Sequence, residues 1–264
     1  MLASPLARLS LPARMVVQSD DSQTLWRSQH HGSERTVGRL NTADWLNGAS
    51  TAPMMLPTRF NIISGLPDVS EVRPRLSAAE YEAWCVGVVR RLIELTPPDQ
   101  VAIFYQTPGR FSGEGGAWLD KAFFCTTGAR GAGAACVWQK VVLIQDSVGR
   151  RRGGRPGFVN LLCYSRRHRV PRGFTTVDVL PDRGHMSYHN AIGEEACCDA
   201  IDYCRRYVDG EDRVPIFDPF CGVGSVLAVA NALGHDSFGM DLNLKCCRAA
   251  NEHECSDGLI AHSI

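Results

Sequence analysis

The chain has 264 residues, which is enough for one large α/β domain with a substantial buried core. Lys and Arg together number 28, as do Asp and Glu, so net charge gives no general attraction to an acidic partner. No apolar run is long enough to cross a bilayer, and we expect no membrane span.

The eleven cysteines do not form the pattern of a disulfide framework or a zinc site. The chain is not a short secreted scaffold, and it contains no C-x-x-C motif. We therefore expect reduced thiols, no bound metal and an intracellular location, in the cytoplasm or the nucleus.

Residues 1–33 show no clear hydrophobic period, and we expect a loosely ordered segment ahead of a single domain over 34–264. The first nineteen residues contain two arginines, several leucines and serines, and no acidic residue. This composition fits a mitochondrial transit peptide and fits a disordered terminus equally well, so a mitochondrial location stays open.

Helices and apolar strands alternate along the rest of the chain. The clearest helix follows Ser77, which forms a capping box with Glu80, and ends before Pro97. We expect strands at 36–40, 59–63, 101–105, 135–144, 158–164, 214–217 and 237–240, and helices at 42–46, 77–95, 118–125, 189–208, 226–233 and 244–250. The alternation predicts a doubly wound α/β fold with a mostly parallel sheet covered on both faces.

The strand at 59–63 runs into Ser64-Gly65-Leu66-Pro67-Asp68. The carboxyl end of a strand is where open α/β sheets bind ligands. Asp68 is therefore a candidate catalytic residue, as a base or an anchor for a substrate hydroxyl. Asp68 could equally cap the turn that follows.

A basic segment lies between Lys140 and Arg172, with nine Lys or Arg residues and one acid, Asp146. It includes a predicted arginine-rich hairpin between two strands. The candidate nucleic-acid-binding residues are Arg150, Arg151, Arg152, Arg155, Arg166 and Arg167. A solvated surface is the alternative. Trp118, Trp138 and Tyr164 are interpreted as core residues.

The most informative stretch is 214–241. A short strand ends at Asp218, Gly222 and Gly224 turn the chain into a helix, and a second strand ends at Asp241. Strand, glycine turn, helix, strand and acid make up a nucleotide-binding half-unit. A dinucleotide fold usually has a third glycine, and Leu227 occupies that place here.

The sequence Asp-Pro-Phe-Cys-Gly-Val-Gly-Ser in this stretch resembles the S-adenosylmethionine (SAM) loop of the amino-methyltransferases that modify adenine or cytosine. The resemblance implies that Asp241 holds the ribose and that His189 begins a further cofactor-contacting segment. It implies that the residues surrounding the methionine and sugar are Asp218, Phe220, Cys221, Gly222, Gly224 and Ser225.

The cofactor unit comes last in this chain, whereas in most SAM-dependent folds it comes first. This order resembles a circularly permuted class of nucleic-acid amino-methyltransferases, over about residues 36–250. The resemblance implies a doubly wound, mostly parallel, seven-stranded sheet of the Rossmann-like methyltransferase type.

The chain departs from that class in two places. The family's catalytic loop is Asp, Asn or Ser followed by Pro-Pro and an aromatic residue, and its polar side chain accepts a hydrogen bond from the base amine. Ser64 matches the first place, so the resemblance implies that Ser64 is a catalytic hydrogen-bond acceptor. Gly65-Leu66-Pro67 follows it here, so no aromatic side chain is present to stack on a base. The segment between the last sheet strand and His189 is also too short for a domain that reads a DNA sequence. RNA, or DNA presented by a partner protein, is therefore the expected substrate, with RNA preferred.

Two other hypotheses remain at this point. The first is a catalytically silent member of the fold that binds nucleic acid or a catalytic partner, which the unusual Ser-Gly-Leu-Pro-Asp loop favours. The second is a methyltransferase for a small molecule or a protein, which would leave the arginine cluster unused.

Overall fold

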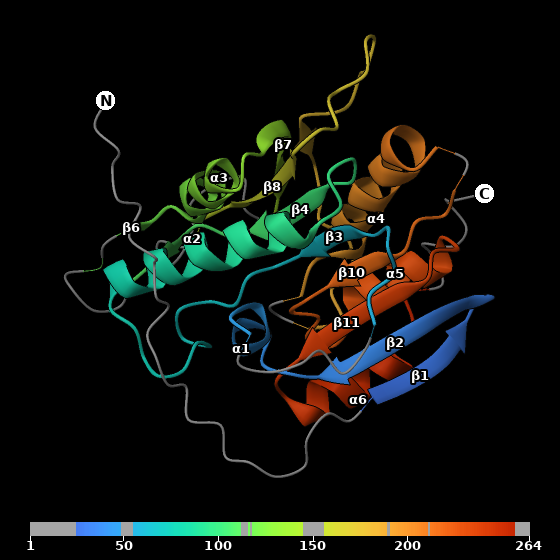
Figure 1. Cartoon of the computed structure of the whole chain (residues 1–264), viewed down its shortest axis with the longest axis horizontal. Coiled ribbons are helices and arrows are strands. Elements are labelled where there is room, and N and C mark those ends of the chain that lie inside the picture. Colours follow the sequence, from blue (N-terminus) through green and yellow to red (C-terminus); the bar gives the residue numbers. More distant parts are fainter. Residues whose placement is uncertain are drawn as a thin grey trace.

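The computed structural model describes residues 25–48, 55–111, 116, 118–144, 156–188, 191–210 and 212–256. A nine-stranded sheet forms its centre (Figure 1), in the order β1-β2-β11-β10-β3-β4-β8-β7-β9. The strands are β1 (Leu25–His30), β2 (Ser33–Arg39), β3 (Asn61–Ser64), β4 (Ala102–Gln106), β7 (Ala135–Leu143), β8 (Phe158–Ser165), β9 (Val179–Leu180), β10 (Ile216–Asp218) and β11 (Ser237–Asp241).

The middle of this sheet is parallel. β2, β11, β10, β3 and β4 pair in parallel with one another in this order, and β8 is antiparallel to both β4 and β7. The last residues of the five parallel strands therefore lie at one edge, which we call the carboxyl edge, and the opposite edge is the amino edge. The expectation of a mostly parallel sheet is confirmed.

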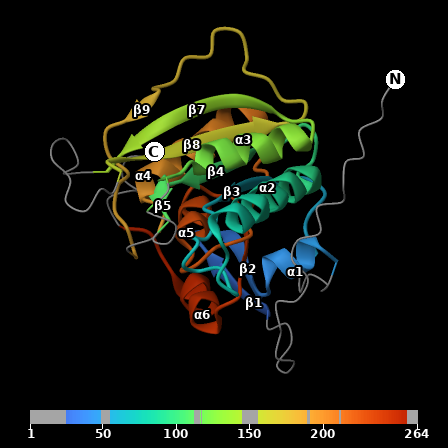
Figure 2. The same cartoon turned by 90° about the vertical axis from the view of Figure 1, so that its left-hand side faces the viewer.

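Helices cover both faces of the sheet, as predicted (Figures 1 and 2). α2 (Ala78–Leu95) and α3 (Lys121–Gly131) pack on one face, and α1 (Thr42–Leu46) lies next to α2. α4 (Glu194–Tyr203), α5 (Ser225–Ala232) and α6 (Leu244–Glu252) pack on the other. Strand side chains alternate between the two cores: Ile216 joins the α4–α5 side and Phe217 the α2 side.

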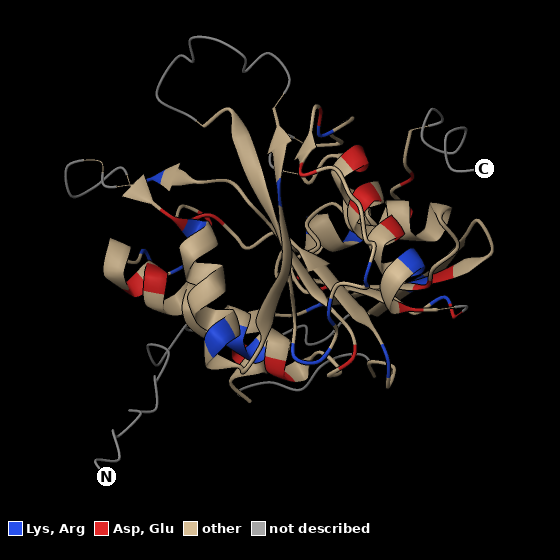
Figure 3. Cartoon of the chain, turned by 90° about the horizontal axis from the view of Figure 1, so that it is seen from above, with Lys and Arg blue, Asp and Glu red and all other residues tan. Residues whose placement is uncertain are grey.

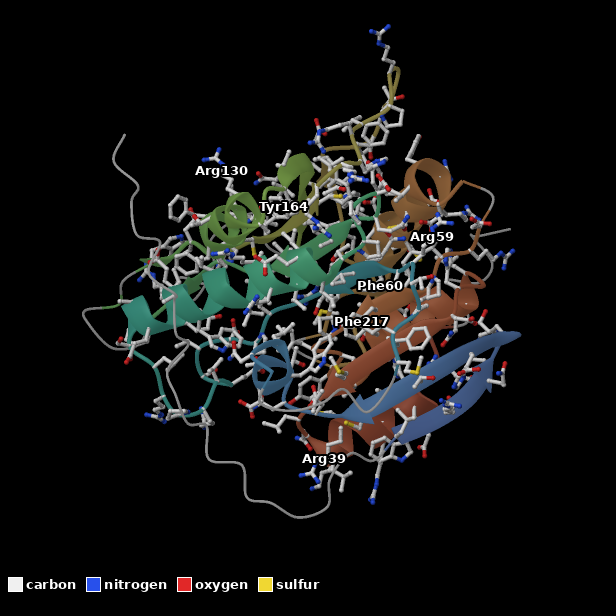
Figure 4. The ribbon with its side chains drawn as sticks, in the orientation of Figure 1. Arg39, Arg59, Phe60, Arg130, Tyr164 and Phe217 are labelled. Carbon is white, nitrogen blue, oxygen red and sulfur yellow. The ribbon has the colours of Figure 1, made fainter. Side chains whose placement is uncertain are left out.

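The α2 side illustrates how apolar periodicity builds the core. Ser77 and Glu80 form the predicted capping box, and the buried face of α2 is the apolar stripe seen in the sequence. On the sheet beneath, Phe60 packs edge-on against Phe217 with ring centroids 5.8 Å apart (Figure 4).

Apart from shifts at element ends, among them the start of α4 at Glu194 and not at 189, the structure differs from the expectations in four places. The sheet has nine strands and not seven, because β1 and the two-residue β9 extend its edges. β1 lies inside the segment expected to be loosely ordered, since residues 25–39 form an antiparallel hairpin; residues 1–24 lie outside the described part. The α3 helix begins at Lys121 and not at Trp118, because the Asp120 side chain caps the backbone amide of Phe123. Trp118 is half exposed and not a core residue, whereas Trp138 and Tyr164 are buried as predicted.

Two further features complete the fold. Trp118–Leu119 form strand β6, which pairs with β5 (Gly109–Arg110) in a separate two-stranded ribbon, and α4 continues into a π-helical turn, η3 (Cys204–Val208). Within the described residues no helix combines the length and apolar character needed to cross a membrane.

Candidate cofactor and catalytic site

The loop between β10 and α5 is held in a fixed shape at the carboxyl edge. Gly222 and Gly224 have φ angles of 51° and 90°, in the left-handed region that favours glycine. The Cys221 amide donates to the Met240 carbonyl at 2.9 Å, which ties the loop to β11. A Cβ on Gly224 would lie 2.8 Å from Cα of Ala250. Glycine there is thus required both by backbone conformation and by the close approach of α6.

Asp241 ends β11 beside this loop. Its Oδ2 accepts the Gly222 amide at 3.1 Å and its Oδ1 accepts the Asn243 amide at 2.7 Å. Burial raises the pKa of this carboxyl, and the two amide bonds oppose the rise. A carboxylate offers about four acceptor positions, so two remain for hydroxyl groups of a ligand.

Asp218 is the buried acid at the end of β10. Its Oδ1 accepts the Ser64 hydroxyl at 2.6 Å and the Phe220 amide at 3.1 Å. Burial raises its pKa to about 7, despite these two bonds, and the nearby Asp241 carboxylate adds to the rise. The Asp218–Ser64 bond joins the last residues of β10 and β3.

Ser64 has no surface accessible to solvent in this structure. Its hydroxyl proton is directed to Asp218, so only its lone pairs are available to another donor. Because a substrate amine would reach the hydroxyl only after its neighbours moved, the geometry favours a role for Ser64 in linking the two strands.

Asp68 is the accessible acid of the same loop, with a side chain 51% exposed. It forms an ion pair with Lys121, whose side chain is 4% exposed. The Asp68 amide donates to Glu71 Oε2 at 2.8 Å, and the Tyr81 hydroxyl donates to the Pro67 carbonyl at 2.7 Å. The loop is therefore anchored on both α2 and α3.

Lys121 is a residue of the candidate site that the sequence did not predict. It is the first residue of α3, where the helix dipole disfavours a cation, and it is almost entirely buried. A buried ammonium needs a partner, and Asp68 is the ion-pair partner that the described residues supply. The helix prediction started too early to place Lys121 at a helix N-terminus, so no pattern in the sequence indicated this pair.

The end of β4 adds two buried polar groups at the same edge. The Nε2 atom of Gln106 is buried without a hydrogen-bond partner in the described part of the chain, and the buried hydroxyl of Tyr105 has Arg183 nearby. Burial raises the pKa of Tyr105 to about 12, and the Arg183 guanidinium opposes the rise. A polar residue ending a buried strand at this edge was the signal available for Gln106.

The other predicted cofactor residues differ in what they could offer a ligand. Phe220 is half-buried near Trp84, with ring centroids 6.2 Å apart, and the Ser225 hydroxyl lies 2.8 Å from that of Ser187. The Cys221 thiol is buried, and burial raises its pKa well above the usual value, so this residue offers its backbone and not a reactive sulfur. His189 lies outside the described residues.

Of the predicted basic residues, Arg166 and Arg167 lie within the described part of the chain, and both are at the amino edge. Arg166 donates to the carbonyls of Glu94 and Thr96 at the end of α2, on the amino edge, and Arg167 lies 3.9 Å from Asp99 on that same edge. Acidic and basic residues are interspersed over the described part of the chain (Figure 3). The arginines at 150–152 and 155 lie outside the described residues, but Leu143 and Phe158, the ends that flank their segment, pair at the carboxyl edge.

Comparison with known proteins identifies the fold. No protein-family model and no curated protein matches the sequence. Among solved structures, the cytosine-N4-specific PvuII DNA methyltransferase superposes with a TM-score of 0.60 at 12% identity, covering 87% of this chain and 90% of that one. A protein of Thermus thermophilus assigned as a DNA modification methylase, solved with S-adenosyl-L-methionine, gives 0.56 at 13% identity, covering 81% and 90%.

A third solved structure, the complex of M1.HpyAVI with SAM, has a TM-score of 0.56 at 9% identity and covers 83% of this chain and 98% of that one. At these identities the likeness concerns the fold alone. The described chain therefore has the α/β fold found in these methyltransferases.

Proposed function

We propose that this protein is a SAM-dependent methyltransferase that acts on a nucleic acid. One observation carries the proposal: the Asp-Pro-Phe-Cys-Gly-Val-Gly-Ser loop and Asp241 form one hydrogen-bonded unit, through the Gly222 amide, at the carboxyl edge of this sheet. The solved neighbours of the same fold include two complexes with SAM.

The residues present fit this cofactor. Asp241 retains acceptor positions for the two ribose hydroxyls, and Gly222, whose Cβ would meet no atom within 4 Å, leaves the backbone open to a ligand. Asp218, Phe220, Ser225 and the backbone of Cys221 complete the proposed cofactor site, and His189 stays a predicted member. When bound, SAM supplies an electrophilic methyl group, so the protein's tasks are positioning and proton removal.

Asp68 is the proposed proton acceptor, because it is the exposed carboxylate of the loop that ends β3, next to the cofactor strand β10. The Lys121 ammonium holds this carboxylate in place. Ser64 is the proposed positioning residue, since its hydroxyl donates to Asp218 and joins the strand that bears Asp68 to the strand that bears the cofactor loop.

The strand order supports a circularly permuted arrangement. β10 and β11, the last strands in sequence, sit in the middle of the sheet, with β3 and β4 on one side and β2 on the other. The proposed catalytic loop thus precedes the cofactor loop in the chain and lies beside it in space.

The class of nucleic acid is the finer part of the proposal. The short segment after β8 favours a substrate that is read without a recognition domain, either RNA or DNA presented by a partner protein. The solved neighbours are named as DNA enzymes and give no support to the preference for RNA. DNA and RNA are therefore equal candidates.

The test is incubation of the full chain with methyl-labelled SAM and separate pools of DNA, tRNA and rRNA, followed by nucleoside mass spectrometry. Transfer to one of these pools is the expected result. Cofactor binding without transfer to any pool would identify a silent member of the fold. Methyl transfer only to a metabolite or protein extract would show that the substrate is a small molecule or a protein and not a nucleic acid.

A further inference from the structure

The two-stranded ribbon at the carboxyl edge has a solvent-facing side with an unusual pair of residues. β5 and β6 are antiparallel, and Arg110 is directly opposite Trp118. Leu119 is buried in the α2 core, and Phe111 packs against the same core. Trp118 is 50% exposed and Arg110 is also exposed. Because cross-strand partners project to the same side, Arg110 and Trp118 share the outward side of the ribbon.

This ribbon adjoins the proposed catalytic loop. Trp118 and Leu119 lead directly through Asp120 into Lys121, the residue paired with Asp68. A Cβ on Gly109 would lie 4.0 Å from Cε of Lys121, so both strands of the ribbon are close to the ion pair. Figure 2 shows β5 on the side of the molecule where the parallel strands end.

An outward tryptophan beside an arginine is a combination suited to an unpaired nucleotide. The indole face can stack on any base, and a guanidinium can contact the phosphate next to that base. With half of its surface exposed, the Trp118 side chain is accessible to a ligand. The loop at 64–68 contains no aromatic side chain, which leaves a base at Asp68 without a stacking partner from that loop.

The end of β4 provides a second and independent observation. Gln106 lies three residues before Gly109, is 1% exposed, and has an Nε2 donor without a partner in the described chain. A buried donor of this kind is costly while it stays unpaired, and a ligand would reach it only after neighbouring side chains moved, as for Ser64. Ring nitrogens and carbonyl oxygens of nucleobases are suitable acceptors.

We propose that Trp118 and Arg110 form a platform for an unpaired nucleotide, with the indole stacked on its base and the guanidinium on its phosphate. The platform replaces the aromatic residue absent from the loop at 64–68. This inference rests on the proposed function, because it takes the substrate to be a nucleic acid whose target base lies outside a duplex stack.

The experiment measures binding of fluorescently labelled single strands, one DNA and one RNA of the same mixed sequence, to the full chain by anisotropy. Trp118→Ala should weaken binding by about 5- to 150-fold, the equivalent of one lost base–aromatic stack, and Trp118→Phe should retain most of the affinity. Phe123→Ala is the matched control, since Phe123 is 57% exposed but belongs to α3. Its affinity should equal that of the wild type.

Arg110→Ala should lower the slope of log affinity against log salt by about 0.7 to 0.9, as expected for one lost phosphate contact. Arg130→Ala is its control, because Arg130 is exposed at the far end of α3 (Figure 4). Wild-type affinity in Trp118→Ala, or an equal loss in Phe123→Ala, would overturn the platform.

Calorimetric titration with SAM separates this inference from the proposed function. Trp118→Ala should bind SAM as the wild type does. If the wild type binds SAM and methylates a nucleic acid while Trp118→Ala does both equally well, the platform alone is wrong. If the wild type binds neither SAM nor either strand, the proposed function and the platform fall together.

Discussion

Asp68 and Lys121 form the pair of residues on which the proposed chemistry depends. Asp68→Asn should abolish methyl transfer and leave SAM binding unchanged, because an amide cannot take up a proton. Lys121→Ala should lower kcat, since the carboxylate would lose the ammonium that holds it. Glu71→Gln is the control: it removes a negative charge from the same loop but keeps an oxygen that can accept the Asp68 amide.

Ser64→Ala should cost less than Asp68→Asn, about 1 to 3 kcal/mol of transition-state stabilisation, because it removes one hydrogen bond. A larger loss in Ser64→Ala than in Asp68→Asn would indicate that Ser64 accepts directly from a base amine. Full activity in both variants would remove the loop at 64–68 from the catalytic site.

Asp218 should make stability depend on pH. Its pKa rises on folding from 3.8 to about 7, so between these values the native state binds more protons than the unfolded state. Its contribution to stability is therefore complete below about pH 4, falls as pH rises and levels off above about pH 7. A shift of about three units corresponds to about 4 kcal/mol.

Urea unfolding of the wild type and Asp218→Asn between pH 4 and pH 8 measures this effect. The free energy of unfolding of the variant, relative to that of the wild type, should increase with pH over that range. Asp209, whose pKa burial also raises to about 7, keeps part of the pH dependence in the variant. If the free energies of unfolding of the two proteins differed by the same amount at every pH in this range, the raised pKa of Asp218 would be contradicted.

The helix α5 depends on its glycine turn, which places α5 and α6 in contact. Gly224→Ala should destabilise the protein by about 2 to 5 kcal/mol, because it adds a left-handed backbone penalty and a Cβ that meets Ala250. Gly222→Ala is the matched control, with φ of 51° and no atom within 4 Å of its Cβ, and should cost about 1 to 2 kcal/mol. Equal losses in urea unfolding would rule out the close approach.

The elements that the sequence predicted well are those with strong local signals. The capping box at Ser77, the apolar runs of β7 and β8, and the glycine turn after Asp218 all depend on neighbours in the chain. β1 and the β5–β6 ribbon were missed because pairing in a short polar hairpin depends on partner strands and not on hydrophobic alternation.

The candidate site was predictable in part for the same reason. The residues of the β10–α5 loop and Asp241 follow one another closely in sequence and form a recognisable pattern. The Lys121–Asp68 and Ser64–Asp218 contacts join residues 53 and 154 positions apart, and no local pattern indicates such pairs. Composition alone gave no sign that the Arg166 side chain would donate to the carbonyls at the end of α2, and its role in nucleic-acid binding stays a prediction.

At the scale of the whole molecule, nucleic-acid binding should depend on the arginines between β7 and β8. Replacing Arg150, Arg151, Arg152 and Arg155 with Ala should weaken binding and lower the slope of log affinity against log salt by about 0.7 to 0.9 for each lost phosphate contact. SAM affinity should not change. The control removes four surface arginines elsewhere, at positions Arg90, Arg91, Arg205 and Arg206. An unchanged slope in the variant that lacks the arginines at 150–152 and 155 would show that this segment is a solvated surface without phosphate contacts.

The account as a whole depends on SAM binding at the ends of β10 and β11. Calorimetric titration of the wild type, Asp241→Ala and Asp236→Ala tests it most directly, because the two acids flank the same strand at opposite edges of the sheet. The wild type and Asp236→Ala should bind SAM equally, and Asp241→Ala should bind it more weakly by about 1 to 3 kcal/mol, the value of hydrogen bonds to a charged acceptor. Absence of SAM binding by the wild type, or equal affinity in all three proteins, would contradict the account.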